Sequence, residues 1–149
     1  MLLLLLTLVV EREGVGALRG RGLVLPVVQG LLEEGGRVLL GTRGESPYLG
    51  RWDLPGGVVG EREDIVVALV REYREETGIE VQGVVLLDVF HYLGNGGSPA
   101  VFVLYRITRY AGEASPSSEL SRLRFFDAGS VTQLDLTPWA RHFLSCRWT

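Results

Sequence analysis

The chain has 149 residues, of which 46% are hydrophobic, and its formal net charge at pH 7 is −3. This length and apolar content suit one folded domain over residues 1–149 and exclude a disordered chain. The negative charge excludes the basic footprint of a nucleic-acid partner. The only cysteine, Cys146, cannot form an intrachain disulfide, which permits a reducing compartment, so we expect a cytoplasmic protein.

The chain opens with a strongly apolar segment, residues 2–10, that contains six leucines and two valines. It lacks the basic flank and the small-residue cleavage site of a signal peptide, and charged residues follow at 11–13. It is also too short to span a bilayer, so no membrane partner is expected. We predict a buried or edge strand. An exposed apolar edge could be covered by a second subunit, which would make a homodimer.

The rest of the chain reads as strands interrupted by few helices. The predicted strands are 23–33, 37–43, 80–92, 100–108 and 122–127, and the predicted helices are 63–77 and 137–147, with a short turn near 128–134. Residues 34–36 and 94–98 are typical of hairpin turns. Thr137 and Pro138 suit a helix start, and Gly78 suits a helix C-cap. Hairpins with few helices predict an α/β fold with a mixed sheet between helices.

Three glutamates of the first predicted helix share one face. Glu72, Glu75 and Glu76 stand at i, i+3 and i+4, which places them side by side. Like charges at this spacing weaken an isolated helix by roughly 0.2–0.5 kcal/mol per pair. A divalent hard cation offsets that repulsion, because carboxylate oxygens suit Mg²⁺ or Mn²⁺. The face therefore predicts a metal site.

The loop before this helix is Trp-Asp-Leu-Pro-Gly-Gly, residues 52–57. The paired glycines Gly56 and Gly57 let the backbone approach a ligand closely. A tight turn here could offer main-chain carbonyls to the same metal. Magnesium commonly bridges protein carboxylates and substrate phosphates, and a bound metal lowers the pKa of its water. Loop and helix together indicate metal-assisted attack of water on phosphorus.

This spacing resembles the signature of the Nudix hydrolases. The signature positions are held by Gly57, Glu63, Arg71, Glu72, Glu75, Glu76, Gly78 and Ile79. Tyr73 stands where the family usually has an aliphatic residue, although its ring can still pack in a core. Gly60 and Arg62 stand where many members carry Glu and Gly, so the loop before the helix is expected to curve differently.

The resemblance implies an α/β/α sandwich and metal-dependent cleavage of a pyrophosphate bond in a nucleotide. The implied metal ligands are the Gly56 carbonyl, Glu72, Glu75 and Glu76. Glu72 is also the first candidate to accept the proton of the attacking water. Arg71 would pair with Glu63 and hold the glutamates in position. A nucleoside triphosphate is slightly favoured over ADP-ribose or diadenosine polyphosphates, because the chain is short and lacks obvious added substrate elements.

Five residues outside the signature are weaker candidates. Glu119, or Glu113 in its place, lies in a loop that often carries a metal ligand or base in similar proteins. Arg43, with Arg51 as second choice, could contact substrate phosphates through its fork of donors. Trp52 could stack on a base. Each has an ordinary alternative: a solvated glutamate, a surface arginine or a loop-anchoring tryptophan.

Two other functions fit less well. A Nudix fold can be kept as a nucleotide sensor after catalysis is lost. In such proteins the glutamates of the signature are usually replaced, whereas here all three are present. A prenyl diphosphate isomerase shares the fold but needs a catalytic cysteine in the core. The only cysteine here is Cys146, near the end of the chain.

Overall fold

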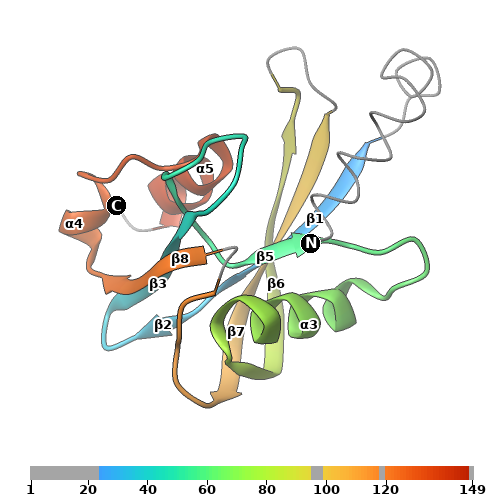
Figure 1. The fold of residues 1–149 in the computed structure, drawn as a ribbon, viewed down its shortest axis with the longest axis horizontal. Helices are drawn as coiled ribbons and strands as arrows, with labels where there is room; N and C mark the ends of the chain where they lie inside the picture. Colours follow the sequence, from blue (N-terminus) through green and yellow to red (C-terminus); the bar gives the residue numbers. More distant parts are fainter. Residues whose placement is uncertain (1–23, 95–98, 118–119, 148–149) are drawn as a thin grey trace.

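The computed structural model describes residues 24–94, 99–117 and 120–147 (Figure 1). The strand predicted over 2–10 and the candidate Glu119 lie outside the described residues. The elements are β1 (Leu25–Leu31), β2 (Glu33–Glu34), β3 (Arg37–Arg43), β4 (Trp52–Asp53), β5 (Gly56–Val58), α3 (Ile65–Thr77), β6 (Glu80–Tyr92), β7 (Ala100–Ala111), β8 (Leu120–Phe126), α4 (Ala128–Val131) and α5 (Pro138–Arg147). Within these residues, no helix combines the length and the apolarity needed to cross a membrane.

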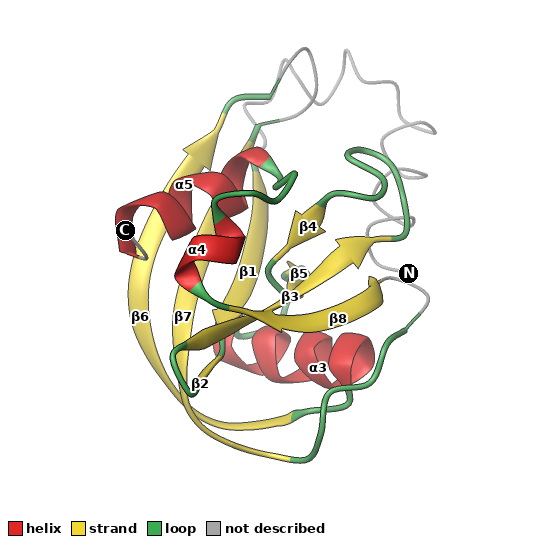
Figure 2. Cartoon of the chain, turned by 90° about the vertical axis from the view of Figure 1, so that its left-hand side faces the viewer, coloured by secondary structure: helices red, strands yellow, loops and turns green. Residues whose placement is uncertain are grey.

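The strands form two sheets (Figures 1 and 2). The first is mixed, with the order β5-β1-β7-β6; β1 and β7 run parallel and the other neighbours run antiparallel. The second is antiparallel, and its strand β3 pairs with β2, β4 and β8. The predicted α/β class with a mixed sheet is confirmed, and the division into two sheets is an addition to the prediction.

Strand β1 separates two hydrophobic clusters because its side chains alternate between the faces of the sheet. Val28 packs in the cluster that contains α3, whereas Val27 and Leu31 pack in the cluster that contains α5. The mixed sheet therefore has one helix on each face. This arrangement holds α3 against β1 and against β5, the strand that contains the two glycines of the loop.

The turns and caps follow the local sequence closely. Helix α3 begins after Asp64, whose carboxylate accepts hydrogen bonds from two backbone N–H groups of the first turn. It ends at Gly78, which has a left-handed φ of 76°. The Thr137 hydroxyl accepts a hydrogen bond from Ala140 N at 3.3 Å. The hairpin turn at residues 34–36 is also present. The predicted helix caps Gly78 and Thr137 and the first predicted hairpin turn are confirmed. Residues 95–98 of the second predicted hairpin turn lie outside the described residues.

Two short strands were not predicted, and one predicted strand is divided. Strands β4 and β5 are too short to show a period in sequence, and β5 also begins with two glycines. Strand β5 forms because Val58 pairs with Val27 of β1. The segment 23–33 is divided at Leu32, which lies between β1 and β2 and whose carbonyl accepts from Leu39 N at 3.0 Å.

Candidate active site

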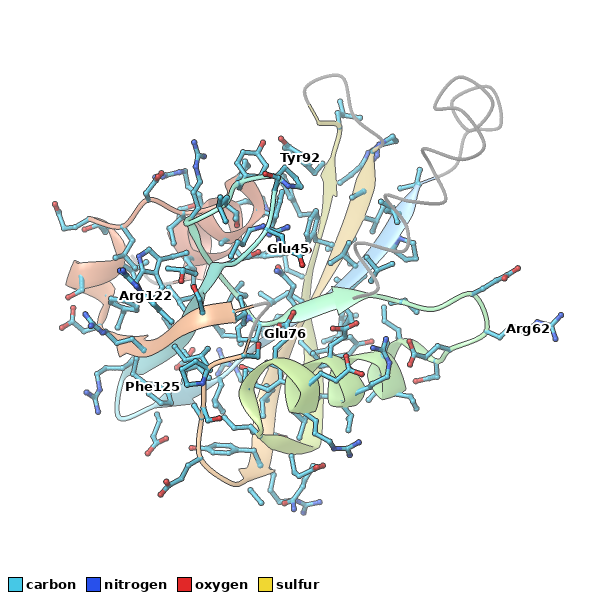
Figure 3. All side chains as sticks on the ribbon, viewed as in Figure 1. Glu45, Arg62, Glu76, Tyr92, Arg122 and Phe125 are labelled. Atoms are coloured by element: carbon cyan, nitrogen blue, oxygen red, sulfur yellow. The ribbon has the colours of Figure 1, made fainter. Side chains whose placement is uncertain are left out.

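Helix α3 directs its glutamates to β5. The side chains of Glu72 and Glu76 are buried, with 3% and 7% of their residue surface exposed, whereas Glu75 is exposed. Oε2 of Glu76 accepts a hydrogen bond from Gly56 N at 2.9 Å. Figure 3 shows Glu76 projecting from α3 toward this strand. The glycine loop and the carboxylates that the sequence placed separately are therefore in direct contact.

Both glycines of the loop are required by close approach. A Cβ atom on Gly57 would lie 2.3 Å from Cδ of Glu72, and one on Gly56 would lie 2.0 Å from the carbonyl oxygen of Val28. Neither distance is compatible with a side chain, and the Val28 obstacle is backbone that cannot swing away. Because Gly57 has no side chain, the Glu72 carboxylate can lie against it. Because Gly56 has none, β1 can pass close to it.

Arg71 joins the acidic residues of the site. Its Nε and Nη2 donate to the two carboxylate oxygens of Glu63 at 2.6 and 2.8 Å, a two-pronged pair. Its Nη1 donates to Glu72 at 2.8 Å and to Glu75 at 3.3 Å. Arg71 and Glu63 thus make the contact that the resemblance implies. One guanidinium offsets part of the repulsion among the carboxylates.

The Arg71–Glu63 pair makes folding stability sensitive to acid. The Arg71 hydrogen bonds lower the pKa of Glu63 from 4.5 to about 2. Because the pKa is lowered in the folded state, the stabilisation is present above pH 4.5 and is lost as the pH falls toward 2. We expect the free energy of unfolding to fall more steeply with acid in the wild type than in Glu63→Gln. Urea titrations followed by tryptophan fluorescence between pH 2 and 7 measure this, and parallel curves would contradict it.

The available donors fit a hard divalent cation. Within the described residues, no three acidic, histidine or cysteine side chains are already gathered around one point, and Arg71 engages Glu72 and Glu75. The candidate donors are carboxylate oxygens and the carbonyl of Gly56, all of them hard oxygen ligands of the kind that Mg²⁺ and Mn²⁺ prefer. The set contains no thiolate or imidazole, so it fits these ions better than a soft metal.

A buried aspartate anchors the start of the glycine loop, and sequence reasoning missed it. Oδ1 of Asp53 accepts hydrogen bonds from Leu54 N at 2.8 Å, Trp139 Nε1 at 2.9 Å, Gln29 Nε2 at 3.0 Å and Thr137 Oγ1 at 3.1 Å. Burial raises the pKa of Asp53, against the effect of these donors. The carboxylate ties β1, β4 and α5 together. Its position between the apolar residues Trp52 and Leu54 is the sequence feature that could have indicated its burial.

Arg43 lies beside this aspartate. Its Nε donates to the Pro47 carbonyl at 2.8 Å, and its Nη1 is 3.5 Å from Oδ2 of Asp53. Its guanidinium carbon is 5.9 Å from the ring centre of Trp139. The structure therefore gives Arg43 a structural contact at the end of β3, and only part of its donor fork is used by these two oxygens.

The remaining candidates are dispersed. Arg51 places its guanidinium 4.9 Å from the ring centre of Tyr48 and 3.6 Å from Asp135. Trp52 packs edge-to-face on Phe126 at 4.7 Å, which is a core contact. Glu113 is exposed. Arg62 also points away from the glutamates, into solvent (Figure 3).

Three aromatic residues form a second feature that the sequence did not assemble. The Tyr48 and Tyr92 hydroxyls are hydrogen-bonded, and both rings meet Trp139 edge-on at 5.4 Å. Tyr48 has a φ of 63°, the only described non-glycine residue with a positive φ. A bulky residue in that region is rare and marks a position held by its surroundings.

Comparisons with known proteins agree with this geometry. A family model described as the NUDIX domain matches residues 24–145. The ADP-ribose pyrophosphatase of Methanocaldococcus jannaschii is 30% identical over 110 residues, covering 72% of this chain and 64% of that protein. The oxidized purine nucleoside triphosphate hydrolase of Danio rerio is 33% identical over 108 residues, covering 68% of this chain and 65% of that protein. The chain thus spans just under two thirds of the length of these relatives.

A solved structure is similar over most of the fold. The crystal structure of a MutT NUDIX hydrolase from Burkholderia pseudomallei superposes with a TM-score of 0.75 at 28% identity, covering 83% of this chain and 97% of that one. The matched region contains the glycine loop, α3 and both sheets. The chain therefore belongs to the Nudix hydrolase family.

Proposed function

We propose that this protein is a metal-dependent hydrolase that cleaves a pyrophosphate bond in a nucleotide. The observation that carries the proposal is the packing of the buried glutamates Glu72 and Glu76 against the two glycines of the loop. Arg71 holds Glu72 in place through a hydrogen bond. Both curated relatives are named for hydrolysis of nucleotides, which supports the same reaction here.

The residues of the site would have three roles: metal binding, proton acceptance and positioning. Gly56, through its carbonyl, and the carboxylates of Glu75 and Glu76 would hold Mg²⁺ or Mn²⁺, with Glu72 beside them. When bound, the metal neutralises charge on phosphate oxygens and lowers the pKa of a coordinated water. Glu72 accepts the proton of the attacking water. Its carboxylate is held for this by Arg71 at 2.8 Å, and Glu63 in turn orients Arg71.

We infer a nucleoside triphosphate as the preferred substrate, ahead of ADP-ribose or diadenosine polyphosphates. The half-buried rings of Tyr48 and Tyr92, held on the buried Trp139, are suited to contact a base. Oε1 of Gln29 is buried and has no hydrogen-bond partner in the described protein, and an N–H of a base would satisfy it. Arg51 is partly exposed beside Tyr48, where a phosphate could reach it. The relatives' names cover both substrate classes.

A panel of nucleotides tests this proposal directly. Phosphate release is measured with Mg²⁺ or Mn²⁺ and a coupled pyrophosphatase and phosphatase. Turnover of one class supports the hydrolase and identifies its preference. If nothing turns over, but one nucleotide raises the melting temperature only when metal is present, the alternative of a nucleotide-binding sensor is favoured instead.

We further propose that residues 1–149 act as one domain in the cytoplasm without a nucleic-acid partner. The charge of −3 and the single cysteine support this setting. Gel filtration with and without DNA tests the absence of nucleic-acid binding, and a shift of the protein peak would contradict it.

A further inference from the structure

Strand β6 is the outer strand of the mixed sheet. Among the described residues it pairs with β7 on one side only (Figure 2). It runs for 13 residues, which is long for an edge strand. Its outer backbone N–H and C=O groups form a row that another strand can join. The sheet therefore ends in an edge that is open to addition.

This edge is also apolar. Val85, Leu86, Val89 and the following Leu93 are each between 53% and 70% exposed. Natural edge strands are usually protected by lysine, proline, charged side chains, bulges or very short length. Strand β6 has no lysine or proline, although its pairing with β7 shifts register near Gly83 and between Leu86 and Asp88. Three exposed apolar side chains in the outer strand and a fourth directly after it indicate that this stretch is covered in the working protein.

The chain supplies a suitable segment close by. Leu25, at the start of β1, pairs with Ala100 of β7, which pairs with Tyr92 at the end of β6. The start of β1 is therefore two strand spacings, about 10 Å, from the end of β6. Residues 11–23 can span about 43 Å when extended. The apolar residues 2–10 can reach any point along β6.

We propose that residues 2–10 add to the outer edge of β6 as a further strand of the same chain. The segment has no charged residue and only one hydroxyl, on Thr7, so it suits the exposed side chains of Val85, Leu86, Val89 and Leu93. A direct return from the end of β6 to β1 places it parallel to β6. Pairing of β6 with a second copy would cover the edge but leave residues 2–10 exposed, whereas addition within the chain covers both apolar surfaces.

Hydrogen exchange on the full chain and on a chain lacking residues 1–10 tests this. In the full chain, the β6 amides that point away from β7 should exchange slowly. In the truncated chain they should exchange at least tenfold faster, while amides of α3 keep their protection. Unchanged exchange at β6 after truncation would overturn the proposal. So would a full-length dimer in which β6 protection disappears on dilution, because that result assigns the edge to a second copy.

A pair of matched substitutions gives a second measurement. Val89→Thr places a hydroxyl at the edge, and Val67→Thr makes the same change on exposed α3. We expect Val89→Thr to lower the melting temperature of the full chain by about 2–4 °C and to change the truncated chain little. Val67→Thr should have the same small effect in both chains. Equal effects of Val89→Thr in the two chains, or failure of Val89→Thr to exceed Val67→Thr in the full chain, would contradict addition of the segment.

Discussion

Glu72→Gln is expected to lower turnover by about 10²–10⁴-fold, the usual contribution of a positioned general base, while the melting temperature stays near that of the wild type. The amide has almost the shape of the carboxylate, so it fits the space beside Gly57. It removes the charge that a metal needs and the group that accepts the proton. Arg71 keeps its two hydrogen bonds to Glu63, so α3 stays anchored.

Glu80→Gln is the matched control for this experiment. Glu80 is a glutamate just beyond α3, but its side chain is about half-exposed and bonded to Arg74, with Nη2 at 2.8 Å from Oε2. Its replacement should leave turnover within about twofold of the wild type, as for a surface pair of small energetic weight. Steady-state kinetics on the best nucleotide of the panel compares the two variants. Turnover near that of the wild type in Glu72→Gln would refute its role as base.

Asp53→Ala is expected to lower the free energy of unfolding by about 3–5 kcal/mol, which is typical when one partner of a buried ionic network is removed. Four donors share one oxygen of this carboxylate, among them Trp139 Nε1 and Thr137 Oγ1. Without the carboxylate, the buried Trp139 Nε1 and Thr137 hydroxyl lose their acceptor. Because Leu54 N also loses its bond to this carboxylate, 2.8 Å long, the start of the glycine loop should loosen as well.

Urea unfolding measures this effect, and Asp135→Ala is the matched control. Asp135 is a mostly exposed aspartate whose ion pair with Arg51 is long at 3.6 Å, so its loss should hardly change stability. Asp53→Asn should fall between the two, because the amide oxygen still accepts. Equal stability of Asp53→Ala and Asp135→Ala would show that the buried network does not stabilise the fold.

Local patterns explain why much of the fold could be predicted. The limits of α3 agree with the prediction to within two residues at its start, because Asp64 and Gly78 are chemically specific caps. The start of α5 agrees for the same reason, through Thr137. The predicted strand 80–92 coincides with β6. In each case the information lies in residues close to one another in the chain.

Contacts distant in sequence could not be predicted in this way. Strand β5 exists because Val27 and Val58 meet, although 31 positions separate them. Asp53 looked like a loop residue until β4 brought it to Gln29 and Trp139. The contact of Arg43 with that same aspartate also joins separate strands, and its contact with substrate phosphates stays a prediction.

The sequence by itself determined the chemistry of the candidate site, because helix geometry places Glu72, Glu75 and Glu76 on one face wherever α3 forms. Only the tertiary structure decided which of these carboxylates are buried and which backbone they meet. The packing of α3 across β1 and β5 brings Gly56 N to 2.9 Å from Glu76 and removes Glu72 from solvent. The physical reason is that side-chain periodicity is set by the local backbone, whereas burial and contact depend on how separate elements pack together.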